Sequence, residues 1–152
     1  MRELPFDGEF DAAFNAYTAW GYFEDDAENL RALKAFRRAL KLGGRFLFDF
    51  VNVYGISRRA PRVWEASDDG IVILRESRID YRRGIAWETD RIIEPGKAPR
   101  ETTTFGVRMY TVDVLCAMFE RAGFCVDRIV GDWDESDFSF ESPRVIFSCA
   151  AV

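Results

Sequence analysis

The feature that most constrains this sequence is a nearly continuous apolar run at 45–51, Arg-Phe-Leu-Phe-Asp-Phe-Val, which directly follows a glycine pair. Such a run is typical of a strand covered on both faces, as in the parallel sheets of α/β proteins. Apolar residues at helical spacing predict a helix over 26–41 that Gly43 and Gly44 end. An earlier apolar run at 10–16 predicts a buried strand. Strand, helix and strand within about 40 residues form a βαβ unit with a right-handed crossover, so the predicted fold class is α/β.

The residue pattern of the sequence changes at about residue 62. Short β-rich segments separated by turn signals of Asp, Pro and Gly lie at 63–66, 71–79, 85–93 and 102–110. Their spacing predicts an antiparallel meander over 62–110. A second helix is expected to begin after Thr111 as its N-cap and to end at Gly123. Two final strands, at 124–130 and 145–150, are predicted to be antiparallel to each other.

Composition bounds the class of protein further. The chain has 152 residues, of which 48% are apolar, which is enough for one core, and we expect residues 1–152 to form a single domain. No apolar run approaches the ~20 residues of a membrane span, and residues 1–5 do not read as a signal peptide, so a soluble, cytoplasmic protein is predicted. The net charge of −5 disfavours nucleic acid and anionic membranes as partners, because both are bound through a surplus of Lys and Arg.

Of all the residue counts, the absence of histidine excludes the largest number of catalytic mechanisms. It removes Ser-His-Asp and Cys-His nucleophile systems, histidine metal sites and acid–base catalysis by imidazole. The three cysteines, Cys116, Cys125 and Cys149, are far apart in apolar segments, which favours reduced, buried thiols over disulfides or a metal cluster. No metal site is therefore predicted.

Six segments carry a family resemblance along nearly the whole chain. They are Arg2–Phe6, Phe10–Asn15, Trp20–Phe23, the helix with Leu30 and Leu33, Leu40–Phe46 and Ala122–Phe124. In this order and at this spacing, the chain resembles the C-terminal half of the class I S-adenosylmethionine-dependent methyltransferases. Leu42 is a small departure, because the family usually has proline in the turn before the glycine pair.

The resemblance implies a partial sheet. Of the family's strand order 3-2-1-4-5-7-6, only strands 4-5-7-6 have counterparts, which makes this the C-terminal half of a Rossmann-like methyltransferase sheet. The meander at 62–110 resembles the antiparallel β insertion of some small-molecule members. No glycine-rich G-x-G turn precedes these strands, and the half of the family fold with that turn carries most of the cofactor pocket. We therefore expect one partial domain whose cofactor is S-adenosylmethionine but which binds little of it alone.

The resemblance also implies site residues, at the carboxyl ends of the strands. Asn15, Ala16 and Tyr17 are expected to line the methionine part of the cofactor. Trp20 and Tyr22 are expected to bind the cofactor as well and to shape the methyl-transfer cavity with Tyr17. Trp20 and Tyr22 are explained equally well as a helix-packing cluster, and Asn15 as a simple turn former.

Three further residues are predicted to bind the methyl acceptor, namely Asn52, Tyr110 and Trp64. Tyr110 and Tyr17 are the candidate catalytic residues, although packing alone explains a buried tyrosine at position 110 and core filling explains Trp64. Asp49 stands inside an apolar strand, where a carboxylate needs a partner. Pairing with an arginine is favoured there over a base with a raised pKa.

Two functions are compatible with these features. The first is S-adenosylmethionine-dependent transfer of a methyl group to a small-molecule acceptor, incomplete in this chain alone. The alternative is a non-catalytic dimerising or ligand-binding module that keeps half of the methyltransferase fold. Both leave the strand at 10–16 as an apolar sheet edge, and bare apolar edges pair. We expect a homodimer through this strand, or an N-terminal part absent from this chain, to cover it.

Overall fold

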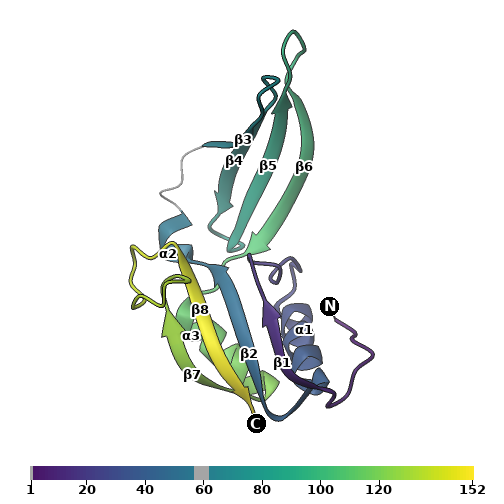
Figure 1. Ribbon diagram of the computed structural model, residues 1–152, viewed down its shortest axis with the longest axis vertical. Helices are drawn as coiled ribbons and strands as arrows, with labels where there is room; N and C mark the ends of the chain where they lie inside the picture. The colour runs from purple at the N-terminus through teal and green to yellow at the C-terminus, as the bar shows by residue number, and fades with distance from the viewer. Residues whose placement is uncertain (1, 57–61) are drawn as a thin grey trace. The chain divides into compact units, whose positions relative to one another are not determined.

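The computed structural model describes residues 2–56 and 62–152, without the side chains of 62–65. The chain divides into two compact units, the first made of Met1–Ile56 with Tyr110–Val152 and the second of Ser57–Met109. The first unit contains β1 (Phe10–Asn15), α1 (Asp26–Ala39), β2 (Leu40–Val51), α2 (Val53–Ile56), α3 (Val112–Ala122), β7 (Phe124–Val130) and β8 (Arg144–Ala151) (Figure 1). The second contains β3 (Arg62–Ala66), β4 (Val72–Asp80), β5 (Ile85–Ile93) and β6 (Arg100–Arg108).

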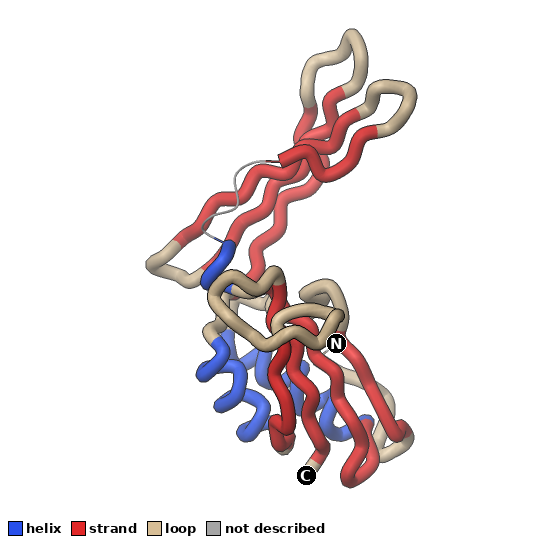
Figure 2. Tube along the Cα trace, turned by 60° about the vertical axis from the view of Figure 1, so that its left-hand side comes forward, coloured by secondary structure: helices blue, strands red, loops and turns tan. Residues whose placement is uncertain are grey.

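The first unit is a four-stranded sheet with helices on one face. Its strand order is β1-β2-β8-β7, in which β1 and β2 are parallel and the other neighbours are antiparallel. Figures 1 and 2 show α1 and α3 side by side on the same face of this sheet. The predicted α/β fold, with a parallel first pair and two antiparallel late strands, is confirmed.

Phenylalanines at alternate positions of β2 build the core between this sheet and its helices. Phe46, Phe48 and Phe50 are fully buried. The ring of Phe48 packs edge-on against Trp20 and against Phe119 of α3, with centroid distances of 5.3 and 5.1 Å. Such aromatic pairs stabilise a core beyond the area that they bury.

The outer part of the sheet differs from the sequence prediction. The strand at 10–16 is the sheet edge that the resemblance implied, but it is not buried as its apolar run predicted, because Phe14 of β1 is 71% exposed. Coverage of β2 on both faces is also wrong for its first half, because Leu47 is 37% exposed between two buried phenylalanines. The physical reason is that β1 has no described neighbour on its outer side and that both longer helices lie on the other face.

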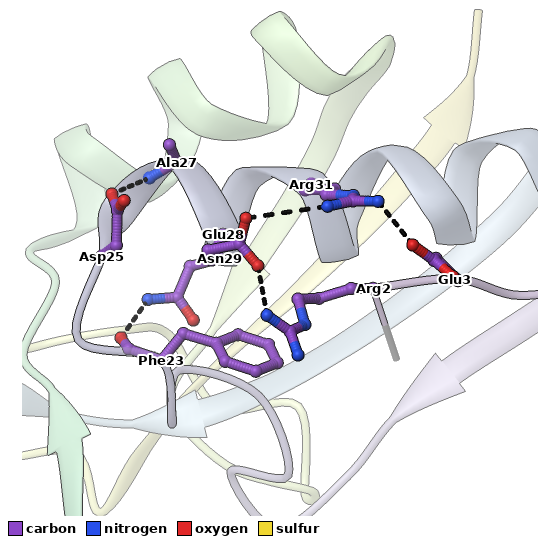
Figure 3. A network of polar contacts seen from close by, with 8 residues as sticks. All are labelled: Arg2, Glu3, Phe23, Asp25, Ala27, Glu28, Asn29 and Arg31. Carbon is purple, nitrogen blue, oxygen red and sulfur yellow. Dashed lines mark hydrogen bonds and ion pairs between the residues drawn. The ribbon is translucent and has the colours of Figure 1, made fainter.

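A polar network ties the N-terminal segment to the start of α1 (Figure 3). Asp25 is the N-cap, and its carboxylate accepts a hydrogen bond of 2.8 Å from the backbone N–H of Ala27. Glu28, at the spacing of a capping box, instead forms ion pairs with Arg2 and Arg31 at 2.5 and 3.8 Å. Its carboxylate therefore anchors the N-terminal segment.

The two ends of α3 lie where the sequence predicted them, but only one has the expected cap. Gly123 ends the helix in the left-handed conformation, with φ of 93°, as predicted. Thr111 is the N-cap, but its side chain makes no capping hydrogen bond.

The second unit is the predicted antiparallel meander, with strand order β3-β4-β5-β6. Arg75 and Asp90 face each other on β4 and β5 and form a bidentate ion pair at 2.6 and 2.7 Å. Trp87 lies opposite Gly106, where a Cβ atom would come within 3.0 Å of the indole ring. Glycine at position 106 therefore makes room for the tryptophan.

The cysteines are free, as predicted, but they are not all buried. Burial raises the pKa of the Cys149 thiol to about 12, whereas Cys125 is exposed on the edge strand β7. The prediction of buried thiols is thus wrong for Cys125, because only alternate residues of β7 face the helices. Among the described residues, no helix has the length and hydropathy to cross a membrane, and no cluster of acidic or cysteine side chains has the composition of a metal site.

Candidate active site

The carboxyl ends of β1 and β2 lie at the same edge of the sheet, because the two strands are parallel. Ligands of open α/β sheets bind outside the carboxyl ends of the strands. This edge therefore holds the candidate site, and it brings Asn15, Ala16 and Tyr17 next to Asp49.

A tight turn follows β1. The N–H of Ala19 donates to the carbonyl of Ala16 at 3.1 Å, and the two central residues, Tyr17 and Thr18, have φ angles of 55° and 57°. Both are therefore in the left-handed region, which non-glycine residues adopt only at an energetic cost. The side chain of Tyr17 points outward and is 80% exposed.

Asp49 is fully buried, and both of its carboxylate oxygens have partners. Oδ2 accepts a hydrogen bond of 2.5 Å from the backbone N–H of Tyr17, and Oδ1 forms an ion pair with Arg144 at the start of β8. The prediction that Asp49 pairs with an arginine is confirmed. The guanidinium of Arg144 also donates to the hydroxyl of Thr18 at 3.1 Å and lies 6.0 Å from the centre of the Tyr17 ring.

Asn15, the last residue of β1, is buried beside this cluster. Its amide nitrogen donates to the backbone carbonyl of Asp49 at 3.2 Å. Its Oδ1 atom has no hydrogen-bond partner within the described part of the chain. A buried acceptor without a donor is costly, so this atom is suited to a donor from a bound molecule.

Trp20 and Tyr110 lie in the core of the first unit. The indole N–H of Trp20 donates to the carbonyl of Asn29 at 3.0 Å. The hydroxyl of Tyr110 donates to Asp26 at 2.7 Å and accepts from the side chain of Asn29 at 2.9 Å. This geometry matches the packing explanation for both residues, and their roles in cofactor or acceptor binding stay predictions.

The remaining predicted residues are placed differently from one another. Asn52 is buried and donates to the carbonyls of Ser139 and Ser142 at 3.2 and 2.7 Å, so it holds the 139–142 loop. The side chain of Tyr22 is exposed, whereas that of Trp20 is buried. The side chain of Trp64 lies outside the described residues. Acceptor binding by Asn52 and Trp64 and cofactor binding by Tyr22 stay predictions.

A hollow of about 230 Å³ lies elsewhere in the first unit. It is lined by Leu47, Arg128, Val130, Asp132, Trp133, Glu135, Ile146 and Ser148. The half-exposed Trp133 thus lines a surface hollow and does not fill the core. An ion pair of 2.6 Å between Arg128 and Glu135 lies beside it.

Sequence reasoning missed Arg144 and Thr18. Asp49 within an apolar strand signals that a cation must be near, but nothing in the sequence selects Arg144 among the arginines. The left-handed turn carries no sequence signal either, because residues 16–19 read Ala-Tyr-Thr-Ala, without glycine or asparagine.

Comparison with known proteins shows which proteins this chain is similar to. No protein-family model matches the chain. YqeM of Bacillus subtilis (strain 168), a protein assigned as a methyltransferase, is 26% identical over 162 residues, which cover 97% of this chain and 61% of YqeM.

Solved methyltransferase structures share the fold. CcbJ from Streptomyces caelestis has a TM-score of 0.82 at 18% identity, covering 95% of this chain and 61% of its own. An S-adenosylmethionine-dependent methyltransferase from Clostridium acetobutylicum has a TM-score of 0.81 at 16% identity, covering 99% and 61%. CalS10 from Micromonospora echinaspora, an amino pentose methyltransferase solved with S-adenosylmethionine bound, has a TM-score of 0.71 at 18% identity, covering 99% and 62%.

The chain thus spans about three fifths of these proteins. The resemblance read from the sequence is confirmed at the level of the fold: the chain has a partial form of the Rossmann-like fold of the class I S-adenosylmethionine-dependent methyltransferases.

Proposed function

We propose that this chain takes part in the transfer of a methyl group from S-adenosylmethionine to a small-molecule acceptor. The observation that carries the proposal is the buried Asn15 at the carboxyl edge of β1, whose Oδ1 atom lacks a donor. The ammonium group of the methionine moiety is a donor of the required kind. The small-molecule class is supported by CalS10, which is described as an amino pentose methyltransferase. The net charge of −5 continues to disfavour nucleic acid and anionic membranes, and a cytoplasmic location stays a prediction.

The chemistry asks for positioning and water exclusion, and histidine is not needed. S-adenosylmethionine, when bound, supplies an electrophilic methyl group on a positively charged sulfur. Asn15 is placed to accept a hydrogen bond from the methionine moiety, and the exposed ring of Tyr17 offers an aromatic face to positive charge. A cation over such a face gains about 0.5–2 kcal/mol. Turnover is proposed to require polypeptide beyond these 152 residues, because the glycine-rich half of the pocket has no counterpart here.

Calorimetric titration with S-adenosylhomocysteine tests the function. The chain alone is expected to show little or no binding. A chimera that places the unmatched part of YqeM before residue 2 is expected to bind it at micromolar concentration. In the chimera, Asn15→Ala is expected to weaken binding about tenfold, since one hydrogen bond to a charged group is lost.

Asp11→Ala is the matched control, because Asp11 lies on the same strand with its side chain 86% exposed. It is expected to leave the affinity unchanged. A folded chimera that binds neither S-adenosylhomocysteine nor S-adenosylmethionine would overturn the proposal.

The exposed edge of β1 favours a second property, homodimerisation through residues 10–16. This edge presents Phe14 and Phe10 to solvent and carries neither proline nor lysine, the residues that commonly block strand pairing. Pairing of two copies along β1 would join two sheets across a twofold axis. It fits the non-catalytic dimerising module, whereas in a complete methyltransferase sheet the same edge of β1 would pair with the family's strand 1.

Analytical ultracentrifugation at micromolar concentration is expected to show a dimer, with amides 12–15 protected from hydrogen exchange. Phe14→Lys is expected to give a monomer, because it places charge on the paired strand. Leu42→Lys is the control, since Leu42 is 81% exposed but lies outside β1. A stable monomer with unprotected amides at 12–15 would exclude the dimer.

A further inference from the structure

Arg144 joins three segments that are far apart in the sequence, at the edge where the candidate site lies. It pairs with Asp49 of β2, donates to Thr18 in the turn after β1, and itself begins β8. We infer that Asp49 and Arg144 are positioning residues that hold the Tyr17–Thr18 turn in its left-handed conformation. Their importance for methyl transfer rests on the proposed function, whereas their hold on the turn does not.

The turn needs such a hold because of its backbone. Tyr17 and Thr18 adopt φ angles of 55° and 57°, a region in which their Cβ atoms crowd the backbone. Glycine would remove this cost, yet neither position has it. Residues in sparsely populated backbone regions persist only where the surroundings fix them, and they gather at active sites.

Asp49 supplies the first part of the hold. Its carboxylate is fully buried, so its hydrogen bond to the N–H of Tyr17 does not compete with water. A hydrogen bond to a charged group in such a place is stronger than a neutral one. It fixes the backbone at the first left-handed residue of the turn.

Arg144 supplies the second part, and it does more than neutralise Asp49. Its Nε atom donates to the carboxylate of Asp49, and its Nη2 atom donates to the Thr18 hydroxyl. The guanidinium also lies 6.0 Å from the centre of the Tyr17 ring. The planar fork of a guanidinium can make these contacts at once, and a lysine ammonium cannot. Asp49 therefore binds the backbone of Tyr17, and Arg144 binds the side chain of Thr18. Both contacts lie next to Asn15, whose Oδ1 has no hydrogen-bond partner among the described residues.

Amide hydrogen exchange of the full chain, followed by NMR, tests this assignment. Arg144→Gln is expected to speed exchange at the Tyr17 amide about tenfold while leaving the Asn29 amide of α1 unchanged. Arg144→Lys is expected to give a similar increase, because it keeps the charge but loses the fork. Thr18→Val removes only the hydroxyl contact and is expected to give a smaller increase of about threefold, which keeps the test open if the Arg144 variants fold poorly.

Rescue separates positioning from general stability. Adding Thr18→Gly to Arg144→Gln is expected to restore most of the Tyr17 protection, since glycine enters the left-handed region without cost. Arg45→Gln, which removes an exposed arginine of β2 paired with Asp127, is the matched control and is expected to change nothing at Tyr17. Protection fully restored by Arg144→Lys, or unaffected by Arg144→Gln and Thr18→Val, would overturn the assignment.

The same variants in the chimera, titrated with S-adenosylhomocysteine, test the proposed function separately. Altered exchange at Tyr17 in a chimera that binds no cofactor would leave the positioning role standing and remove the proposed function. Cofactor binding together with unaltered exchange at Tyr17 would leave the proposed function standing and remove the positioning role.

Discussion

Replacing Asp49 by alanine is expected to lower the free energy of unfolding by about 3–5 kcal/mol, because it breaks a buried ion pair from one side. The substitution leaves the guanidinium of Arg144 without its carboxylate and the N–H of Tyr17 without its acceptor. Asp49 is fully buried and the side chain of Arg144 is only 21% exposed, so little water is available to replace the missing carboxylate. Urea denaturation followed by circular dichroism measures the change.

The matched control is Asp11→Ala on the neighbouring strand. Asp11 also pairs with a cation, Lys41, at 2.8 Å, but this pair is exposed. Exposed ion pairs contribute about 0–1 kcal/mol, so the control is expected to lose no more than that. A loss for Asp49→Ala as small as for the control would show that water reaches Asp49.

Phe48→Ala is the second substitution with a large expected effect, a loss of about 3–5 kcal/mol in the free energy of unfolding. The ring of Phe48 is fully buried and packs against Trp20, Phe119 and Phe147, with centroid distances of 5.3, 5.1 and 6.2 Å. Its removal leaves a cavity at the centre of the core, because rigid aromatic neighbours cannot collapse into the space.

Leu47→Ala is the control for this prediction, one residue along β2 and on the opposite face. Leu47 is partly exposed, so less apolar area returns to water, and a loss below about 1.5 kcal/mol is expected. Equal losses at the two positions, measured by the same urea denaturation, would mean that the face of the sheet without helices is also covered in solution.

The elements of the fold could be predicted because their signals are local. Helical spacing of apolar residues predicted α1, but the predicted stop was wrong: the helix ends at Ala39, and Gly43 and Gly44 lie inside β2. Gly123 predicted the end of α3, and turn residues predicted the strands of the meander. The bounds predicted at 85–93 and 124–130 are those of β5 and β7. The apolar run at 10–16 predicted burial wrongly, whereas the family's strand order correctly implied that β1 is a sheet edge.

The candidate site was less accessible to sequence reasoning because its contacts are not local. Asp49 signalled a buried pair, but its partner Arg144 lies far along the chain and is placed by the pairing of β2 with β8. Aromatic residues close in sequence also behaved differently, since Trp20 enters the core and Tyr22 faces solvent. Outside a helix or strand, side chains do not alternate at a regular spacing between core and solvent. A cluster of aromatic residues there does not indicate which ring is buried.

The position of β8 inside the sheet has a consequence for how the protein is made. This strand separates β2 from β7 and is synthesised after both of them. Until it emerges from the ribosome, β2 can pair only with β1 and β7 has no strand to pair with. The pairing of β2 with β8 must then close a loop that contains the entire meander. Nascent chains halted before β8 are therefore expected to carry β7 unpaired and one edge of β2 open, the state in which chaperones bind.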